Sequence, residues 1–177
     1  MKLDDINLDN IKVAIFDFDN TLAIHKNKDY LQQTRLCEQS RINYYLNSYI
    51  YPDCFYDEIE PCLKSEALWE LINNFRNKNI KMYCLSGMNF SFNLKTKQSF
   101  INKYYGEDIE VMSSSSQRLK LEGTKIIQSI NNCKLSEILF FDDRQDVIDL
   151  LNENGIKGIN VCDIKLSNSE GYREINK

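Results

Sequence analysis

The chain has 177 residues, 42% of them hydrophobic and 27% charged, which fits one globular domain and excludes a disordered chain. Its net charge of −4 argues against general affinity for nucleic acid or anionic membranes, while leaving room for a local basic site. No apolar run reaches the roughly 20 residues that span a bilayer, and the N-terminal MKLDDINLDN is acidic where a signal peptide is basic, so we expect a cytoplasmic protein.

Short apolar runs alternate with helical patterns along the chain. The runs are typical of strands covered on both faces, and they lie at Lys12–Phe16, Ile80–Leu85, Ile109–Met112, Ile138–Phe141 and Gly158–Cys162. Apolar residues at helical spacing fill the intervals Leu63–Asn77, Phe92–Tyr105, Gly123–Asn131 and Asp146–Asn154, with Gly155 after the last. This alternation predicts an α/β fold with a doubly wound parallel sheet.

The segment from about His25 to Pro61 does not fit the alternation. Its polar and aromatic residues suggest a helix from about Tyr30 to Tyr49, followed by an irregular stretch. We interpret residues 25–61 as a small, mostly helical insertion, or mini-cap, after the first strand. The insertion is too short for an independent domain, so we expect residues 1–177 to form a single domain. A low-complexity loop is expected at Ser113–Ser116.

The six cysteines do not form a metal-binding pattern. They contain no CxxC pair, and the chain has one histidine, His25, to complete a zinc set. We therefore expect reduced cysteines that pack as small hydrophobic residues.

Polar residues follow three of the predicted strands at the point where each strand ends. In an open parallel sheet, ligands bind beyond the carboxyl ends of the strands. A further candidate, Lys120, lies at the start of the helical stretch that leads into the Ile138–Phe141 strand. The residues that follow the strands are Asp17, Asp19, Ser86, Gly87, Asp142, Asp143 and Asp146.

The first strand ends in VAIFDFDNTLA, which places two aspartates one residue apart. Asp17 and Asp19 raise each other's pKa unless a positive charge lies near them. A calcium-binding EF-hand loop does not explain the pair, because its sixth position is Leu22 instead of glycine and its twelfth is Lys28 instead of glutamate. A strand also precedes the motif where an EF-hand has a helix.

With these motifs in this order, the chain resembles the haloacid dehalogenase-like (HAD) superfamily, whose members are mostly phosphohydrolases. DFDNTLA matches the first motif of that superfamily, Ser86 the second, Lys120 the third and FFDDRQD the acidic fourth. The resemblance spans Val13 to about Val161. It is most similar to the small magnesium-dependent phosphatases that lack a large cap, and it implies a HAD-like Rossmannoid core.

The resemblance also implies catalytic roles. Asp17 would attack phosphorus and form an aspartyl phosphate. Asp19 would protonate the leaving oxygen and then activate water, a task that a dehalogenase does not require. Ser86 and the Gly87 N–H would bind phosphate oxygens, while Lys120 would offset charge on the nucleophile and the phosphoryl group.

A dianionic phosphate needs a cation to approach this acidic cluster, and a set of oxygen ligands favours Mg²⁺. The ligands implied by resemblance are the Asp17 carboxylate, the Asp19 carbonyl and a fourth-motif aspartate. Asp143 aligns best as that third ligand, with Asp142 beside it. The DDRQD pattern permits either aspartate as the direct metal ligand.

Supporting roles are expected for two further residues. Thr21 would hold the first loop by hydrogen bonding, and Asp146 would orient Lys120 or a metal-bound water. Lys125 is a rival to Lys120 as the third-motif lysine.

The predicted function is a Mg²⁺-dependent phosphomonoesterase that acts on a small phosphorylated substrate, with no membrane partner. Nucleotides and nucleic-acid 3′ ends are also candidate substrates. The alternative is a catalytically idle HAD-like module that binds a partner through the insertion. Specificity is expected to lie in that insertion and in the loop after Ser86, which carries Phe90 and Phe92. The sequence leaves the oligomeric state open.

Overall fold

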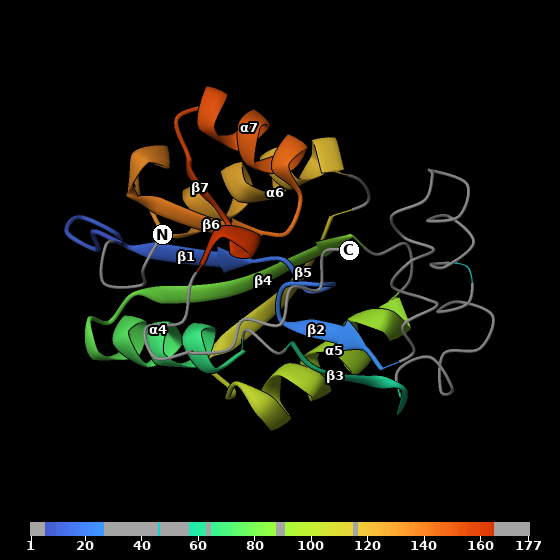
Figure 1. Cartoon of the computed structure of the whole chain (residues 1–177). Helices are drawn as coiled ribbons and strands as arrows, with labels where there is room; N and C mark the ends of the chain where they lie inside the picture. The colour runs from blue at the N-terminus through green and yellow to red at the C-terminus, as the bar shows by residue number, and fades with distance from the viewer. Residues whose placement is uncertain are drawn as a thin grey trace.

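A central sheet of five parallel strands organises the protein. The structure, a computed structural model, describes residues 6–26, 46, 57–62, 65–87, 91–114 and 117–164. The strands are β1 (Val13–Phe16), β4 (Lys81–Gly87), β5 (Ile109–Ser114), β6 (Ile138–Asp142) and β7 (Lys157–Asn160). Their order in the sheet is β5-β4-β1-β6-β7 (Figure 1). The predicted α/β fold with a doubly wound parallel sheet is therefore confirmed.

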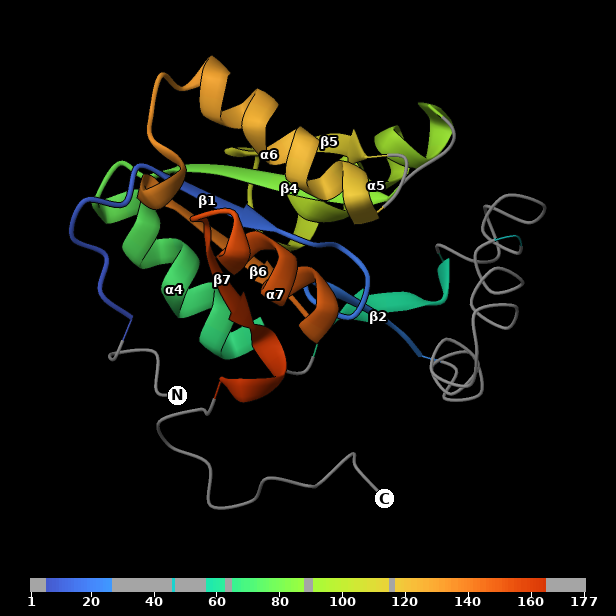
Figure 2. The same ribbon diagram turned by 90° about the horizontal axis from the view of Figure 1, so that it is seen from above.

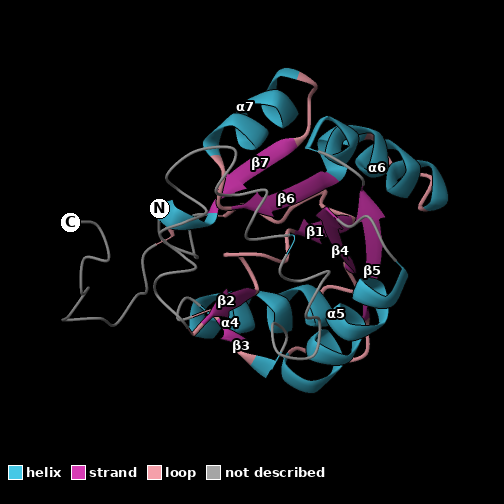
Figure 3. Ribbon diagram, turned by 90° about the vertical axis from the view of Figure 1, so that its right-hand side faces the viewer, coloured by secondary structure: helices cyan, strands magenta, loops and turns pink. Residues whose placement is uncertain are grey.

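Two helices cover each face of this sheet. The helices are α4 (Ser65–Asn77), α5 (Ser91–Tyr104), α6 (Gln117–Ile130) and α7 (Gln145–Glu153). Helices α4 and α5 lie on one face, and α6 and α7 on the other (Figures 1 and 3). Strand β1 pairs with β4 on one side and with β6 on the other, so the direction of winding changes at β1. Within the described part of the chain, no helix combines the length and apolar character needed to cross a membrane.

Alternate residues of β1 face two separate hydrophobic layers. Ala14 and Phe16 belong to the core beneath α4 and α5, whereas Val13 and Ile15 belong to the core beneath α6 and α7. Phe16 also stacks on Phe141 of β6, with ring centroids 5.1 Å apart. All four β1 side chains are buried. This strand is therefore a rigid base for whatever follows its last residue.

A two-stranded antiparallel ribbon, which the sequence patterns did not predict, follows the first strand. It pairs β2 (Ala23–His25) with β3 (Ile59–Pro61) and lies apart from the central sheet (Figure 2). The backbone N–H of Lys26 extends the ribbon by donating to the Glu58 carbonyl over 2.8 Å. The helix expected at residues 30–49 lies outside the described residues, apart from residue 46.

Helix α6 begins earlier than its apolar pattern indicated. It starts at Gln117 instead of Gly123, and β5 takes in the first two residues of the predicted serine loop. Glycine is a poor helix former, so Gly123 looked like a boundary. In the structure, the backbone of Gly123 lies so close to Leu85 of β4 that an added Cβ would be 2.9 Å from Leu85 Cδ2. The absence of a side chain lets α6 pack closely on the sheet.

Replacing Gly123 by valine should therefore destabilise the protein. We expect a loss of about 1–3 kcal/mol, because the added atoms overpack the contact with Leu85. Lys125→Val, on the outer side of α6, is the control, since it brings the lower helix propensity of valine and the loss of an exposed ion pair with Glu122, but no contact with the sheet. Urea unfolding of both variants measures the difference. An equal loss of unfolding free energy in the two variants would show that the close approach at Gly123 does not affect stability.

Candidate active site

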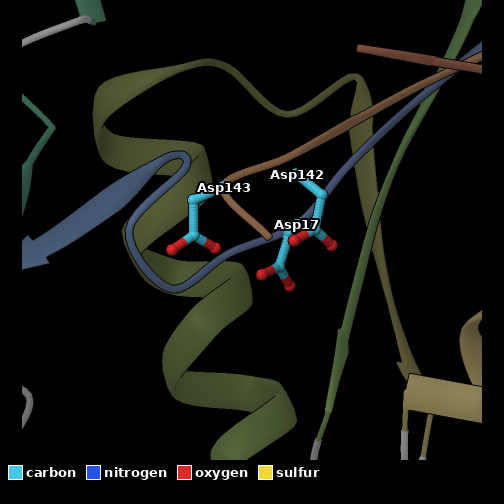
Figure 4. Close-up of side chains that lie close together, drawn as sticks. All are labelled: Asp17, Asp142 and Asp143. Atoms are coloured by element: carbon cyan, nitrogen blue, oxygen red, sulfur yellow. The ribbon is translucent and has the colours of Figure 1, made fainter. Parts of the chain in front are cut away.

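Three carboxylates meet where β1 and β6 end. Asp17 directly follows β1, and its backbone N–H donates to the Phe141 carbonyl over 2.8 Å, which continues the pairing of the two strands. Asp142 is the last residue of β6, and Asp143 follows it (Figure 4). Each carboxylate offers one oxygen such that all three oxygens lie within 4.8 Å of one another. The structure thus brings together Asp17 of the first motif and Asp142 and Asp143 of the fourth.

Lys120 of α6 supplies a positive charge to this cluster. Its Nζ lies 2.9 Å from Asp17 Oδ1 and 2.6 Å from Asp142 Oδ2, and the side chain is buried. Burial lowers the pKa of Lys120, but the two carboxylates outweigh this effect and hold the pKa above its usual value. The ammonium group is therefore charged at neutral pH. The rival Lys125 is exposed and pairs with Glu122 over 2.9 Å.

One lysine leaves the cluster with excess negative charge. Burial raises the pKa of Asp17 to about 7 against the opposing effect of Lys120, and the neighbouring carboxylates add to the rise. Burial and the charge of Asp142 likewise raise the pKa of Asp143 to about 6. Both acids are thus easier to protonate than a free aspartate. A bound cation would relieve the same repulsion.

The two neighbouring aspartates of the fourth motif have different surroundings. Both oxygens of Asp142 are engaged, because Oδ2 accepts from Lys120 and Oδ1 accepts from the Arg144 backbone N–H over 3.0 Å. Among the described residues, no side chain hydrogen-bonds to the Asp143 carboxylate. Asp143 therefore has the oxygens that a cation could take without breaking a contact with another side chain.

Asp146 is not among the acids that contact Lys120, which are Asp17 and Asp142, so of its two expected roles only the orientation of a metal-bound water stays a prediction. Its carboxylate is largely exposed and accepts from Arg144 Nε over 2.9 Å in the first turn of α7. The side chain of Asp142, instead of Asp146, accepts a hydrogen bond from Lys120 and orients it.

The loop that carries the first motif is held by its backbone. The N–H groups of Leu22 and Ala23 both donate to the Phe18 carbonyl, and Asn20 adopts a positive φ of 60°. The hydroxyl of Tyr105 donates to the Leu22 carbonyl over 2.6 Å. Thr21, which we expected to hold this loop by hydrogen bonding, has a buried hydroxyl without a partner among the described residues.

A second buried lysine, absent from our sequence-based site, contacts Asp19 and Ser86. Lys97 of α5 is 2% exposed, and its Nζ lies 2.8 Å from Asp19 Oδ2 and 2.7 Å from Ser86 Oγ. The same ammonium lies 4.4 Å from the centroid of the Phe18 ring. The sequence did hold a signal, because Lys97 occupies the apolar face of its helix, four residues before Ile101.

Gly87 ends β4 beside the last residue of β5. A Cβ built on Gly87 would meet only the Ser114 carbonyl, at an ordinary contact distance of 3.7 Å. The residue is exposed, so its backbone is open to a ligand. The loop residues expected to influence specificity are not covered here, because Phe90 and the side chain of Phe92 lie outside the described part of the chain.

Comparison with solved structures identifies the fold. A phosphoserine phosphatase, solved as an analogue of its phospho-aspartyl intermediate, superposes with a TM-score of 0.59 at 16% identity, over 83% of this chain and 84% of that one. The chain has the HAD-like fold. A Bacteroides fragilis protein, named provisionally as a haloacid dehalogenase-like hydrolase, gives a TM-score of 0.56 at 14% identity, over 84% and 86% of the two chains.

A HAD-family enzyme from Bacteroides thetaiotaomicron, solved with magnesium and inorganic phosphate, has the same fold. Its TM-score is 0.52 at 12% identity, over 85% of this chain and 93% of that one. No protein-family model matches the sequence, and no curated protein matches it significantly. The likeness is therefore one of fold.

Removing the Lys120 charge should strongly destabilise the protein at neutral pH. We expect Lys120→Met to lower the free energy of unfolding by about 3–5 kcal/mol, because it leaves Asp17 and Asp142 buried without their cation. Lys125→Met should cost at most about 1 kcal/mol, since it breaks an exposed pair. Denaturant unfolding in the presence of a chelator measures both. Similar losses for the two lysines would contradict this account.

Proposed function

We propose that this protein is a Mg²⁺-dependent phosphomonoesterase that acts through a phosphorylated Asp17. The observation that carries the proposal is the position of the Asp17 carboxylate. It lies at the end of β1, 2.9 Å from the Lys120 ammonium, within a cluster of three carboxylates. The fold supports the proposal, because structures with the same fold include a phosphoserine phosphatase and an enzyme solved with magnesium and phosphate.

The residues present fit a magnesium ion. The carboxylates of Asp17 and Asp143 would hold it, together with the Asp19 backbone carbonyl that the family resemblance implies. All of these donors are oxygens, which Mg²⁺ prefers, and the pKa values of Asp17 and Asp143 are raised by burial and, to a smaller extent, by the charge of neighbouring carboxylates. When bound, the metal would neutralise that charge and orient a phosphate group.

The first half of the proposed reaction transfers the phosphoryl group to the protein. A carboxylate oxygen of Asp17 attacks phosphorus, and the bond from phosphorus to the ester oxygen breaks. Asp19 gives its proton to that departing oxygen, which leaves as an alcohol. Lys120, the Ser86 hydroxyl and the Gly87 N–H bind the negative oxygens of the phosphoryl group.

The second half regenerates the site. Water attacks the phosphorus of the aspartyl phosphate and gives its proton to Asp19, which is now a carboxylate. The bond between phosphorus and Asp17 breaks, so inorganic phosphate leaves and both aspartates return to their starting states. This proton transfer is typically worth about 10² to 10⁴ in rate. The proposed substrate is a small phosphate monoester in the cytoplasm.

Loss of the nucleophile should abolish turnover without loss of the fold. We expect Asp17→Asn to lower the rate of p-nitrophenyl phosphate hydrolysis with Mg²⁺ by several powers of ten, since a carboxamide is not a nucleophile of useful strength. Asp149→Asn, on the exposed face of α7, is the control and should retain wild-type activity. A chelator should stop the wild-type enzyme as well.

Two results would count against the proposal. Near wild-type turnover by Asp17→Asn would place the nucleophile elsewhere. A wild-type protein that binds Mg²⁺ and phosphate but hydrolyses no phosphate monoester would support the idle binding module instead.

Magnesium binding should weaken as the pH falls. The folded-state pKa values of Asp17 and Asp143, about 7 and about 6, exceed the ordinary value of 3.8. The metal-free protein therefore gains protons on folding, and the stability associated with these two acids is lost as the pH rises from about 4 to about 7. Mg²⁺ replaces those protons, so it should stabilise the protein more at pH 8 than at pH 5.5.

Thermal unfolding with Mg²⁺ or a chelator at the two pH values measures this effect. The Mg²⁺-induced rise in Tm should be larger at pH 8, and Asp143→Asn should reduce it. An equal rise at both pH values would mean that neither acid binds the metal.

A further inference from the structure

We infer that Lys97 is a positioning residue, which holds the Asp19 carboxylate and the Ser86 hydroxyl in the orientations that phosphoryl transfer needs. The inference rests on the proposed function, because it assigns those two groups to the leaving oxygen and to the phosphate. It goes beyond the four motifs, since Lys97 belongs to none of them. Its ammonium joins a residue of the first motif to the residue of the second.

Packing alone does not explain a lysine at this position. The side chain is 2% exposed and lies against the Phe18 ring on the apolar side of α5. Removing an ammonium group from water is costly, and an apolar side chain of similar volume often stabilises such a position more. The reason for a lysine must therefore lie in the groups that its charge contacts.

The contact with Ser86 fixes the direction of the serine hydroxyl. A lysine ammonium has only donors, so Ser86 Oγ must accept from Lys97 Nζ, 2.7 Å away. The serine proton then points to another partner, and no described residue accepts it. A phosphoryl oxygen is such an acceptor. Lys97 thus prepares Ser86 to donate a hydrogen bond to the phosphate.

The contact with Asp19 fixes one carboxylate oxygen and leaves the other for the leaving group. Oδ2 lies 2.8 Å from Lys97, while no described residue hydrogen-bonds to Oδ1. The carboxylate of Asp19 is also outside the group of three that could hold a metal. Its attachment to Lys97 through Oδ2 keeps it from competing with Asp143 for the cation and leaves Oδ1 to carry the proton that goes to the leaving group.

The leaving group of the substrate provides a direct readout of this role. An alkoxide needs a proton to leave, whereas p-nitrophenolate does not. If Lys97→Met misplaces Asp19, the kcat for an alkyl phosphate should fall at least about tenfold more than the kcat for p-nitrophenyl phosphate, as in Asp19→Asn. The inhibition constant for inorganic phosphate should rise roughly fivefold, the factor expected for one hydrogen bond.

Two further variants separate positioning from a structural effect. Lys95→Met lies on the exposed side of the same helix, and it should leave both rates and the inhibition constant unchanged. Lys97→Arg keeps the charge but changes the donor geometry, so its ratio of alkyl to aryl rates should lie between those of wild type and Lys97→Met. A purely structural role would lower both rates in the same proportion.

Each outcome decides the inference. An unchanged ratio in folded Lys97→Met, checked by circular dichroism, overturns it. If Lys97→Met does not fold, Lys97→Arg is compared with wild type, and an unchanged ratio overturns it equally. A wild-type protein that hydrolyses neither substrate refutes the proposed function itself, which is a different result from an unchanged ratio.

Discussion

Three carboxylates, two of them buried, repel one another at one end of the sheet, and the ion pairs of Lys120 with Asp17 and Asp142 make that arrangement possible. The position of α6 follows from this requirement. Gly123 lies three residues after Lys120 and permits close contact with Leu85 of β4. The same close packing brings the lysine to the strand ends. A feature that looks like weak helix formation in the sequence thus helps to place a charge in the site.

The two lysines approach the site from opposite faces of the sheet. Lys120 of α6 contacts Asp17 and Asp142. Lys97 of α5 contacts Asp19 and Ser86. The two cations therefore share no acid. This separation gives two aspartates of one short motif different surroundings, which is the condition for different chemical roles.

The sequence predicted most of the fold because its strands are short, apolar and followed by polar residues. VAIF and ILFF indicated the central strands, and the acids after them indicated the site. The three-residue strands of the β2–β3 ribbon were missed, because such short segments show no measurable alternation and are stabilised by each other. Spacing along the chain likewise could not decide between Lys120 and Lys125, since the choice depends on which side of α6 faces the sheet. Lys97 was missed because a lysine in a helical pattern is normally on the solvated face.

The β2–β3 ribbon has a consequence for how this chain can vary. Its register pairs Ala23 with Pro61 and His25 with Ile59, so the chain leaves the core and returns to it at neighbouring points. The cost of closing such a loop grows only slowly with its length. At this ribbon, the segment between its two strands can therefore be lengthened, shortened or replaced without a change in the five-stranded core. The length of this segment and the stability of the core can then evolve, or be engineered, separately.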